Sequence, residues 1–103
     1  VTIIYEKIST ISEKAIADDG TAAIRLVKDS FCKMLIHKFG KPIISTSANL
    51  SDMSSPAVFN DIEHSILSGV DYVVKYRQQE NMKHTPSSII RMLNNGEVKV
   101  IRK

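Results

Sequence analysis

The sequence predicts an α+β fold with a twisted mixed β-sheet and helices, and three observations predict it. β-branched and aromatic residues gather in short runs that are typical of buried strands, at 1–5, 21–27 and 70–74. Apolar residues recur at helical spacing in two stretches between these runs. Asn95-Gly96 stands between two further apolar runs and predicts a tight hairpin.

The composition is that of one globular domain. The chain has 103 residues, of which 43% are hydrophobic and 24% charged, and this balance argues against disorder. No apolar run approaches the roughly 20 residues of a membrane span, and no signal peptide opens the chain. Cys32 is the single cysteine and cannot form an internal disulfide, so we expect a cytoplasmic protein without membrane partners.

The net charge of +3 is concentrated from Lys75 onward. A basic end favours anionic partners, and ATP, tRNA and plain solvent are all compatible with it.

The first half of the chain predicts two strands and a helix. Residues 1–5 form an unbroken strand run, a short helix is expected at 12–17, and Asp18-Asp19-Gly20 marks a turn. In the run 21–27 a charged Arg25 interrupts apolar neighbours. A guanidinium there must find an anion or reach solvent, because a buried unpaired charge is very costly.

Asp29 or Ser30 can cap a helix that runs to about Phe39 and ends at Gly40. The apolar spacing of this helix indicates packing, and no cysteine or histidine lies at the spacing of a metal site.

The stretch 40–51 is the centre of the functional interpretation. Its apolar run ends abruptly in small hydroxyl and amide side chains, as in a strand that delivers a polar loop into a pocket. Such groups can bind phosphate or carboxylate oxygens. A solvent-facing turn explains the same residues through local hydrogen bonding, so both interpretations stay open at this point.

In the second half, Ser55-Pro56 can start an amphipathic helix that ends near Ser68-Gly69. A strand is expected at 70–74. The hairpin then brings Ser88 and Arg102 together at its open end, because residues that flank a tight turn at similar distances face each other.

Several segments resemble one family. Residues 41–51 are similar to the "KP..STSAN.S" segment of the YrdC-like family, the threonylcarbamoyl-adenylate synthases that begin the threonylcarbamoyl modification of tRNA. The stretch around Arg25 resembles the family's "G..AVR.P", residues 85–91 resemble "PSTII", and Arg102 matches the closing "IIR.G". Asp52 stands where the family usually has Gly, which a positive φ would favour.

The resemblance implies a YrdC-like (dihydroxybutanone phosphate synthase-like) fold, with residues 1–103 as the carboxyl-terminal portion of a single domain. The first residue is Val, so a longer protein is expected. Loss of the remaining strands would leave apolar faces and edges uncovered, and we expect the chain to self-associate.

The resemblance also implies a nucleotidyltransferase that condenses L-threonine, bicarbonate and ATP to threonylcarbamoyl-AMP and pyrophosphate. ATP would enter as a substrate with Mg²⁺, without a prosthetic group, and tRNA would be reached through a separate threonylcarbamoyl transferase. No catalytic nucleophile or protein metal ligand is expected. The implied roles are threonine binding by Arg25, Ser45 and Ser88, ATP binding by Thr21, Ser47, Ser55 and Arg102, and loop support by Asn49.

Two other functions stay open. The basic carboxyl-terminal third would suit a non-catalytic module that binds double-stranded RNA or tRNA, although the chain has no Trp and few aromatic residues for stacking. A regulatory relative could use the same pocket for another small anion.

We predict that the purified 103-residue chain forms no threonylcarbamoyl-AMP by itself. The family carries a Lys-Arg-Lys cluster for the triphosphate, and nothing in this sequence matches it. The measurement is product formation from threonine, bicarbonate and ATP. Robust synthesis would contradict the prediction.

Overall fold

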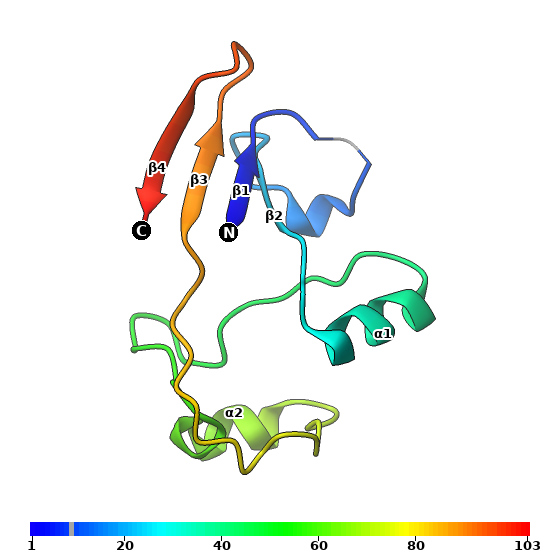
Figure 1. Ribbon diagram of the computed structural model, residues 1–103, viewed down its shortest axis with the longest axis vertical. Helices are drawn as coiled ribbons and strands as arrows, with labels where there is room; N and C mark the ends of the chain where they lie inside the picture. Colours follow the sequence, from blue (N-terminus) through cyan, green and yellow to red (C-terminus); the bar gives the residue numbers. More distant parts are fainter. Residues whose placement is uncertain (9) are drawn as a thin grey trace. The chain divides into compact units, whose positions relative to one another are not determined.

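The computed structural model describes residues 1–8 and 10–103, which form two compact units. The first unit comprises Val1–Ile44 and Ser87–Lys103, and the second comprises Ser45–Pro86. Each unit is described by itself below. The four β-strands drawn in Figure 1 lie within the residues of the first unit, and α2 lies within those of the second.

The first unit is built on a four-stranded sheet of order β2-β1-β3-β4. Its strands are β1 (Thr2–Tyr5), β2 (Ala22–Arg25), β3 (Ile89–Met92) and β4 (Val98–Arg102). β1 pairs with β2 antiparallel and with β3 parallel, and β3 pairs with β4 antiparallel. The mixed sheet and the helices confirm the predicted α+β class, and the strand expected at 1–5 is present.

The predicted hairpin is confirmed, but the two-residue turn expected at Asn95-Gly96 is wrong in detail, because the Gly96 N–H donates to the Leu93 carbonyl at 3.0 Å and Asn94 and Asn95 are therefore the central residues of the turn. Gly96 has φ +90°, a left-handed conformation that favours glycine. The N–H of Leu93 donates to the Glu97 carbonyl at 2.9 Å, and the N–H of Glu97 donates to Asn95 Oδ1 at 2.9 Å. The Asn95 side chain and Gly96 together therefore close the turn between β3 and β4.

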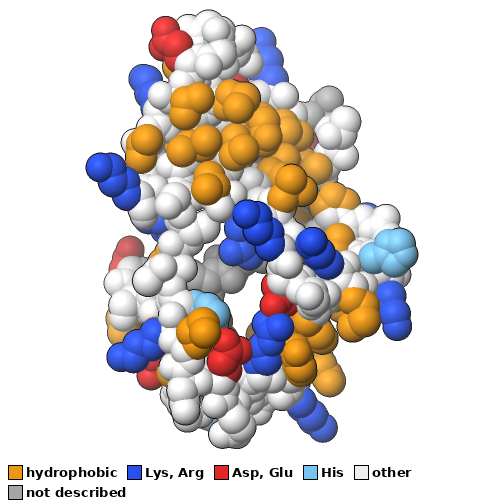
Figure 2. Space-filling model, in the orientation of Figure 1, with side chains coloured by type: hydrophobic (Ala, Val, Ile, Leu, Met, Phe, Trp, Pro, Cys, Tyr) orange, Lys and Arg blue, Asp and Glu red, His pale blue; other side chains and the backbone are white. Residues whose placement is uncertain are grey.

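The two faces of the sheet differ in character. Residues paired across strands share a face, so the register defines one face that is apolar in every strand: Ile3, Tyr5, Ala22, Ile24, Ile90, Met92, Val98 and Val100. Val98 is 54% exposed and Val100 61%. Figure 2 shows hydrophobic side chains gathered over the sheet. Of the described residues only Thr21 and Ala22 are buried, so little of the apolar surface is covered.

The opposite face of the sheet carries the charged residues. It contains Thr2, Ile4, Ala23, Arg25, Ile89, Arg91, Lys99 and Arg102. We call this surface the basic face.

The segment between β1 and β2 forms less helix than expected. A 3-10 helix, η1, spans Glu13–Ala15, and Ser12 caps it by accepting a hydrogen bond from the N–H of Lys14. The turn predicted at Asp18-Asp19-Gly20 follows, with φ +83° at Gly20.

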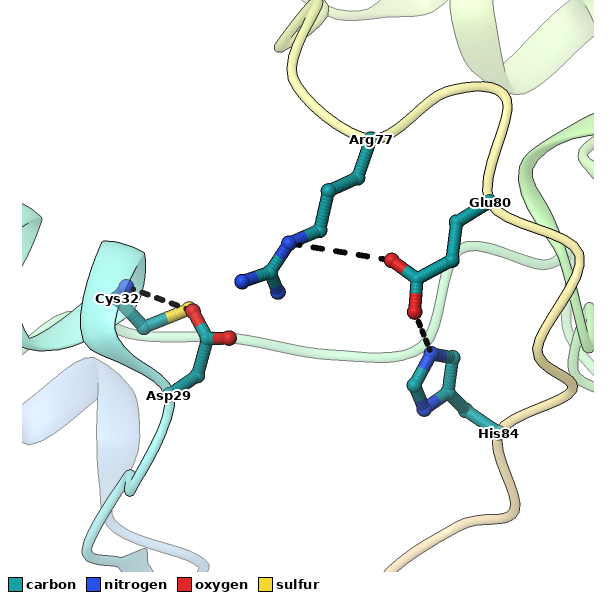
Figure 3. Close-up of polar contacts among 5 residues, drawn as sticks. All are labelled: Asp29, Cys32, Arg77, Glu80 and His84. Carbon is teal, nitrogen blue, oxygen red and sulfur yellow. Dashed lines mark hydrogen bonds and ion pairs between the residues drawn. The ribbon is translucent and has the colours of Figure 1, made fainter.

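The helix predicted after β2 is confirmed as α1 (Ser30–Phe39). Asp29 Oδ2 accepts a hydrogen bond from the N–H of Cys32 at 3.0 Å and caps the first turn (Figure 3). Gly40 ends the helix with φ +81°, and its N–H donates to the Ile36 carbonyl.

The prediction of two further strands is wrong. Residues 70–74 and the apolar run before Ser45 have no strand conformation. A β-branched run needs a neighbouring strand that supplies ladder hydrogen bonds, because β-propensity mainly reports packing against such neighbours. Residues 70–74 instead have their apolar side chains beside those of α2 (His64–Gly69), where they line a shallow hollow.

The long helix expected from Ser55-Pro56 to about Ser68-Gly69 is also wrong in part. It divides into a 3-10 helix, η2 (Phe59–Asp61), and α2. Ile62 and Glu63 between them have extended backbones, with ψ of 126° and 144°. The apolar residues therefore keep a helical spacing in the sequence although the backbone at Ile62 and Glu63 is not helical. None of the helices in the described ranges has the length and apolar character that a bilayer crossing needs.

We predict that Gly40→Ala lowers the free energy of unfolding by about 1 to 2 kcal/mol, because alanine is strained at φ +81°. No atom lies within 4 Å of the added Cβ, so the effect is conformational. The matched control is Gly69→Ala in α2, which also meets no atom within 4 Å and has no positive φ. Chemical denaturation should show a loss for the first variant alone, and equal stabilities would contradict the prediction.

Candidate functional site

One end of the sheet brings together polar residues from three strands, β1, β2 and β4, beside the start of β3. Thr2 of β1 is paired with Arg25 of β2 and with Ile89 of β3, and Ile89 is paired with Arg102 of β4. Neighbouring strands lie about 5 Å apart, so these residues form a row across the sheet. Both chain termini lie at this end in Figure 1. We call the group Thr2, Arg25, Ser87, Ser88 and Arg102 the arginine end.

The Ser87-Ser88 corner of the arginine end is held from both sides. Arg102 donates to the Ser87 carbonyl through Nε at 3.0 Å and through Nη2 at 2.7 Å. Thr2 Oγ1 lies 2.6 Å from Ser87 Oγ, and the N–H of Thr2 donates to the Ser88 carbonyl at 2.7 Å. Sequence reasoning missed Thr2 and Ser87, because the ladder that brings them together joins segments far apart in the chain.

Arg25 differs from the other arginines of the basic face. Its side chain is exposed, and no hydrogen bond or ion pair joins it to the described residues. Arg91 instead approaches Glu6 Oε1 at 3.5 Å through Nη2. Because an arginine offers five N–H donors in a planar fork, Arg25 has its full set available for an anion such as a carboxylate.

The two serines of the corner face opposite ways. Side chains alternate along a strand, and the ladder bond from Thr2 extends the strand geometry to Ser88. Ser87 therefore shares the basic face with Thr2 and Arg25, which agrees with its hydroxyl contact to Thr2. A ligand bound to Arg25 would lie on the same face of the sheet as Ser87. It would reach the Ser88 side chain only past the start of β3, because Ser88 faces the opposite side. Threonine binding by Ser88 stays a prediction.

Thr21 lies at the other end of β2 from Arg25, roughly 13 Å away along the strand. Its side chain is buried, and both its hydroxyl and its N–H donate to Asp19 Oδ1, at 2.7 and 3.0 Å. The hydroxyl bond is the main reason that the pKa of Asp19 lies below its ordinary value of 3.8, and the N–H bond adds to it. The structure thus places Thr21 between the 18–20 turn and β2, with its side chain bonded to the turn, and its contact with ATP stays a prediction.

The remaining predicted residues belong to the second unit. Ser45, Ser47 and Ser55 are exposed. The Asn49 amide donates to the carbonyls of Leu50 and Met53 at 2.8 and 3.1 Å, which ties the 49–53 turn together.

Asp52 in this turn has φ +65°, the left-handed conformation that favours glycine at this position. The grouping of Ser45, Ser47, Ser55 and Asn49 with Arg25 stays a prediction.

A charged cluster orders the loop after residue 74. Glu80 accepts from His84 Nε2 at 3.1 Å and pairs with Arg77 Nε at 3.8 Å (Figure 3). The His84 N–H donates to the Ala57 carbonyl at 3.2 Å. The two side-chain contacts of Glu80 are local, and the His84 backbone bond ties the loop to Ala57, so we assign the cluster to loop structure.

The comparisons with known proteins bear on the whole chain. A family model for Sua5, YciO and YrdC, described as "Telomere recombination", matches residues 1–103. The chain belongs to the Sua5/YciO/YrdC family. The resemblance found in its motifs is thereby confirmed, and the family domain suggests a role in the threonylcarbamoyl modification of tRNA. No curated protein and no solved structure matches the chain.

We predict that Thr21→Val raises the pKa of Asp19 toward 3.8, because the variant loses the hydroxyl donor and keeps the N–H donor. A folded-state pKa that is lowered stabilises the folded chain above pH 3.8. That contribution is lost as the pH falls through the lowered pKa, and less is lost in the variant. NMR titration of the Asp19 carboxyl measures the shift, with Thr85→Val as the control. An unchanged pKa in Thr21→Val would show that the hydroxyl is not its cause.

Proposed function

We propose that this family member takes part in the synthesis of threonylcarbamoyl-AMP from L-threonine, bicarbonate and ATP, for the threonylcarbamoyl modification of tRNA. The observation that carries the proposal is the arginine end, where the Arg25 guanidinium, which has no partner among the described residues, shares one end of the sheet with the braced Ser87-Ser88 corner. Membership of the Sua5/YciO/YrdC family supports the same reaction.

The chemistry suits a site without a nucleophilic side chain. The amine of threonine and bicarbonate form a carbamate with loss of water, and a carbamate oxygen attacks the α-phosphate of ATP. The bond between the α- and β-phosphates breaks, and pyrophosphate leaves. Such a transfer is accelerated by holding the reactants in line and by neutralising charge, to which Mg²⁺ bound with the nucleotide contributes.

Arg25 is the residue proposed to hold the threonine carboxylate. A planar guanidinium can donate two parallel hydrogen bonds to a carboxylate, and Arg25 is exposed at the sheet end. Ser45 and Ser88 are proposed to orient the rest of the amino acid.

ATP is assigned to Thr21, Ser47, Ser55 and Arg102. Two donors of Arg102 are engaged on the Ser87 carbonyl. The remaining three of an arginine's five donors can still reach a phosphate oxygen.

A second candidate function is RNA binding, which one observation favours. The strand register places Arg25, Arg91, Lys99 and Arg102 on the basic face. Clustered cations bind the backbone phosphates of a nucleic acid whatever its sequence. A steep salt dependence of tRNA binding without any effect of threonine would favour this candidate over the enzyme.

We predict that Arg25→Gln weakens L-threonine binding by at least tenfold, because the variant cannot form the charged fork. Arg25→Lys should lose part of the affinity, since it keeps the charge and loses the planar geometry. The control is Lys28→Gln, which removes a charge from an exposed position just after β2. Isothermal titration calorimetry measures the affinities. Unchanged binding in Arg25→Gln, or no binding by the unmodified chain, would refute the proposed function.

A further inference from the structure

We propose that Thr2 and Arg102 are positioning residues for the amino-acid end of the site, acting through the Ser87-Ser88 corner. This inference rests on the proposed function. The motif resemblance to the family assigns Arg102 to ATP binding and gives Thr2 no role. The new observation is that the side chains of both residues hydrogen-bond to Ser87.

Arg102 fixes the peptide unit between the two serines. Its Nε and Nη2 both donate to the Ser87 carbonyl, at 3.0 and 2.7 Å, so two donors of one side chain hold this carbonyl oxygen. The C=O and N–H of a trans peptide point in opposite directions. By holding the Ser87 carbonyl, Arg102 also sets the direction of the Ser88 N–H, a donor at the tip of the strand.

Thr2 fixes the corner from the other side. Its hydroxyl lies 2.6 Å from Ser87 Oγ, and its N–H donates to the Ser88 carbonyl at 2.7 Å. Thr2 is also the cross-strand partner of Arg25. The position of the corner relative to the Arg25 backbone is therefore set by one residue.

These side-chain contacts are additional to the sheet. The ladder between β1 and β3 uses the N–H of Thr2 and does not need its hydroxyl. The pairing of Arg102 with Ile89 likewise concerns the backbone. The two side chains thus add three polar contacts to Ser87, a residue that lies before β3 begins. The corner is the part of the arginine end that these contacts make rigid, and rigid polar groups bind a small ligand with less loss of entropy.

The test compares Thr2→Val, Thr2→Ser and Arg102→Lys in the 103-residue chain. Valine keeps the shape of threonine and lacks the hydroxyl, and serine restores it. Lysine keeps the charge of Arg102 and cannot make the fork. Binding of L-threonine is measured by calorimetry, and binding of Mg²⁺ with a non-hydrolysable ATP analogue by ligand-observed NMR. Lys99→Gln, on the same strand, controls for charge, and thermal unfolding checks that every variant is folded.

We expect Thr2→Val and Arg102→Lys each to weaken threonine binding about fivefold, because each variant loses side-chain hydrogen bonds that hold the Ser87-Ser88 corner. Thr2→Ser and Lys99→Gln should bind threonine within about twofold of the unmodified chain, and Thr2→Val should leave nucleotide binding unchanged. A role in folding alone would not produce this difference between the ligands.

Threonine affinities within twofold in both variants would overturn the inference while the proposed function stands. Loss of nucleotide binding in Arg102→Lys with normal threonine binding would overturn it for Arg102 and return that residue to the nucleotide. If the unmodified chain does not bind threonine, the proposed function fails and the inference fails with it.

Discussion

The first unit depends on the double pairing of β1. This strand has β2 on one edge and β3 on the other, and its parallel ladder with β3 joins the amino-terminal and carboxyl-terminal segments. Moving β1 by one residue would turn Thr2 to the apolar face and separate its hydroxyl from Ser87. The apolar residues Ile3 and Tyr5 oppose such a shift, because it would place them on the basic face. One register therefore selects both the hydrophobic face and the polar arrangement at the sheet end.

Three arginines on the basic face illustrate how placement decides what a charge can do. Arg91 lies within β3 and pairs with Glu6 through Nη2. Arg102 is the last residue of β4, and two of its N–H donors bind the Ser87 carbonyl. Arg25 is the last residue of β2, at the same end of the sheet, and its side chain has no hydrogen-bond or ion-pair partner among the described residues. The chemistry of the side chain is the same in each case, and the surroundings leave only Arg25 with every donor available.

Local signals in the sequence were sufficient for the elements that have local causes. Asp29 and Gly40 bound α1 through caps that involve only nearby backbone groups, and Asn95-Gly96 closes a turn of its own. Residues 70–74 failed as a strand because a strand also requires a partner, which their own composition cannot supply. The break at Ile62 within the expected helix was hidden by an apolar spacing that continues through it.

The residues of the candidate site also differ in whether a local sequence signal could reveal them. Arg25, Ser88 and Arg102 could be proposed from motifs and from hairpin geometry. Thr2 and Ser87 could not, because their contact depends on a parallel pairing across 85 positions that no short motif encodes.

That long separation also has a consequence for how the chain folds. The β3–β4 hairpin and α1 can form early, because their contacts are local and closing a short loop loses little chain entropy. The parallel contact of β1 with β3 must wait until the two ends of the chain meet, and topologies rich in such distant contacts fold slowly. The arginine end would thus be among the last parts of the molecule to assemble, and its appearance would report completion of the sheet.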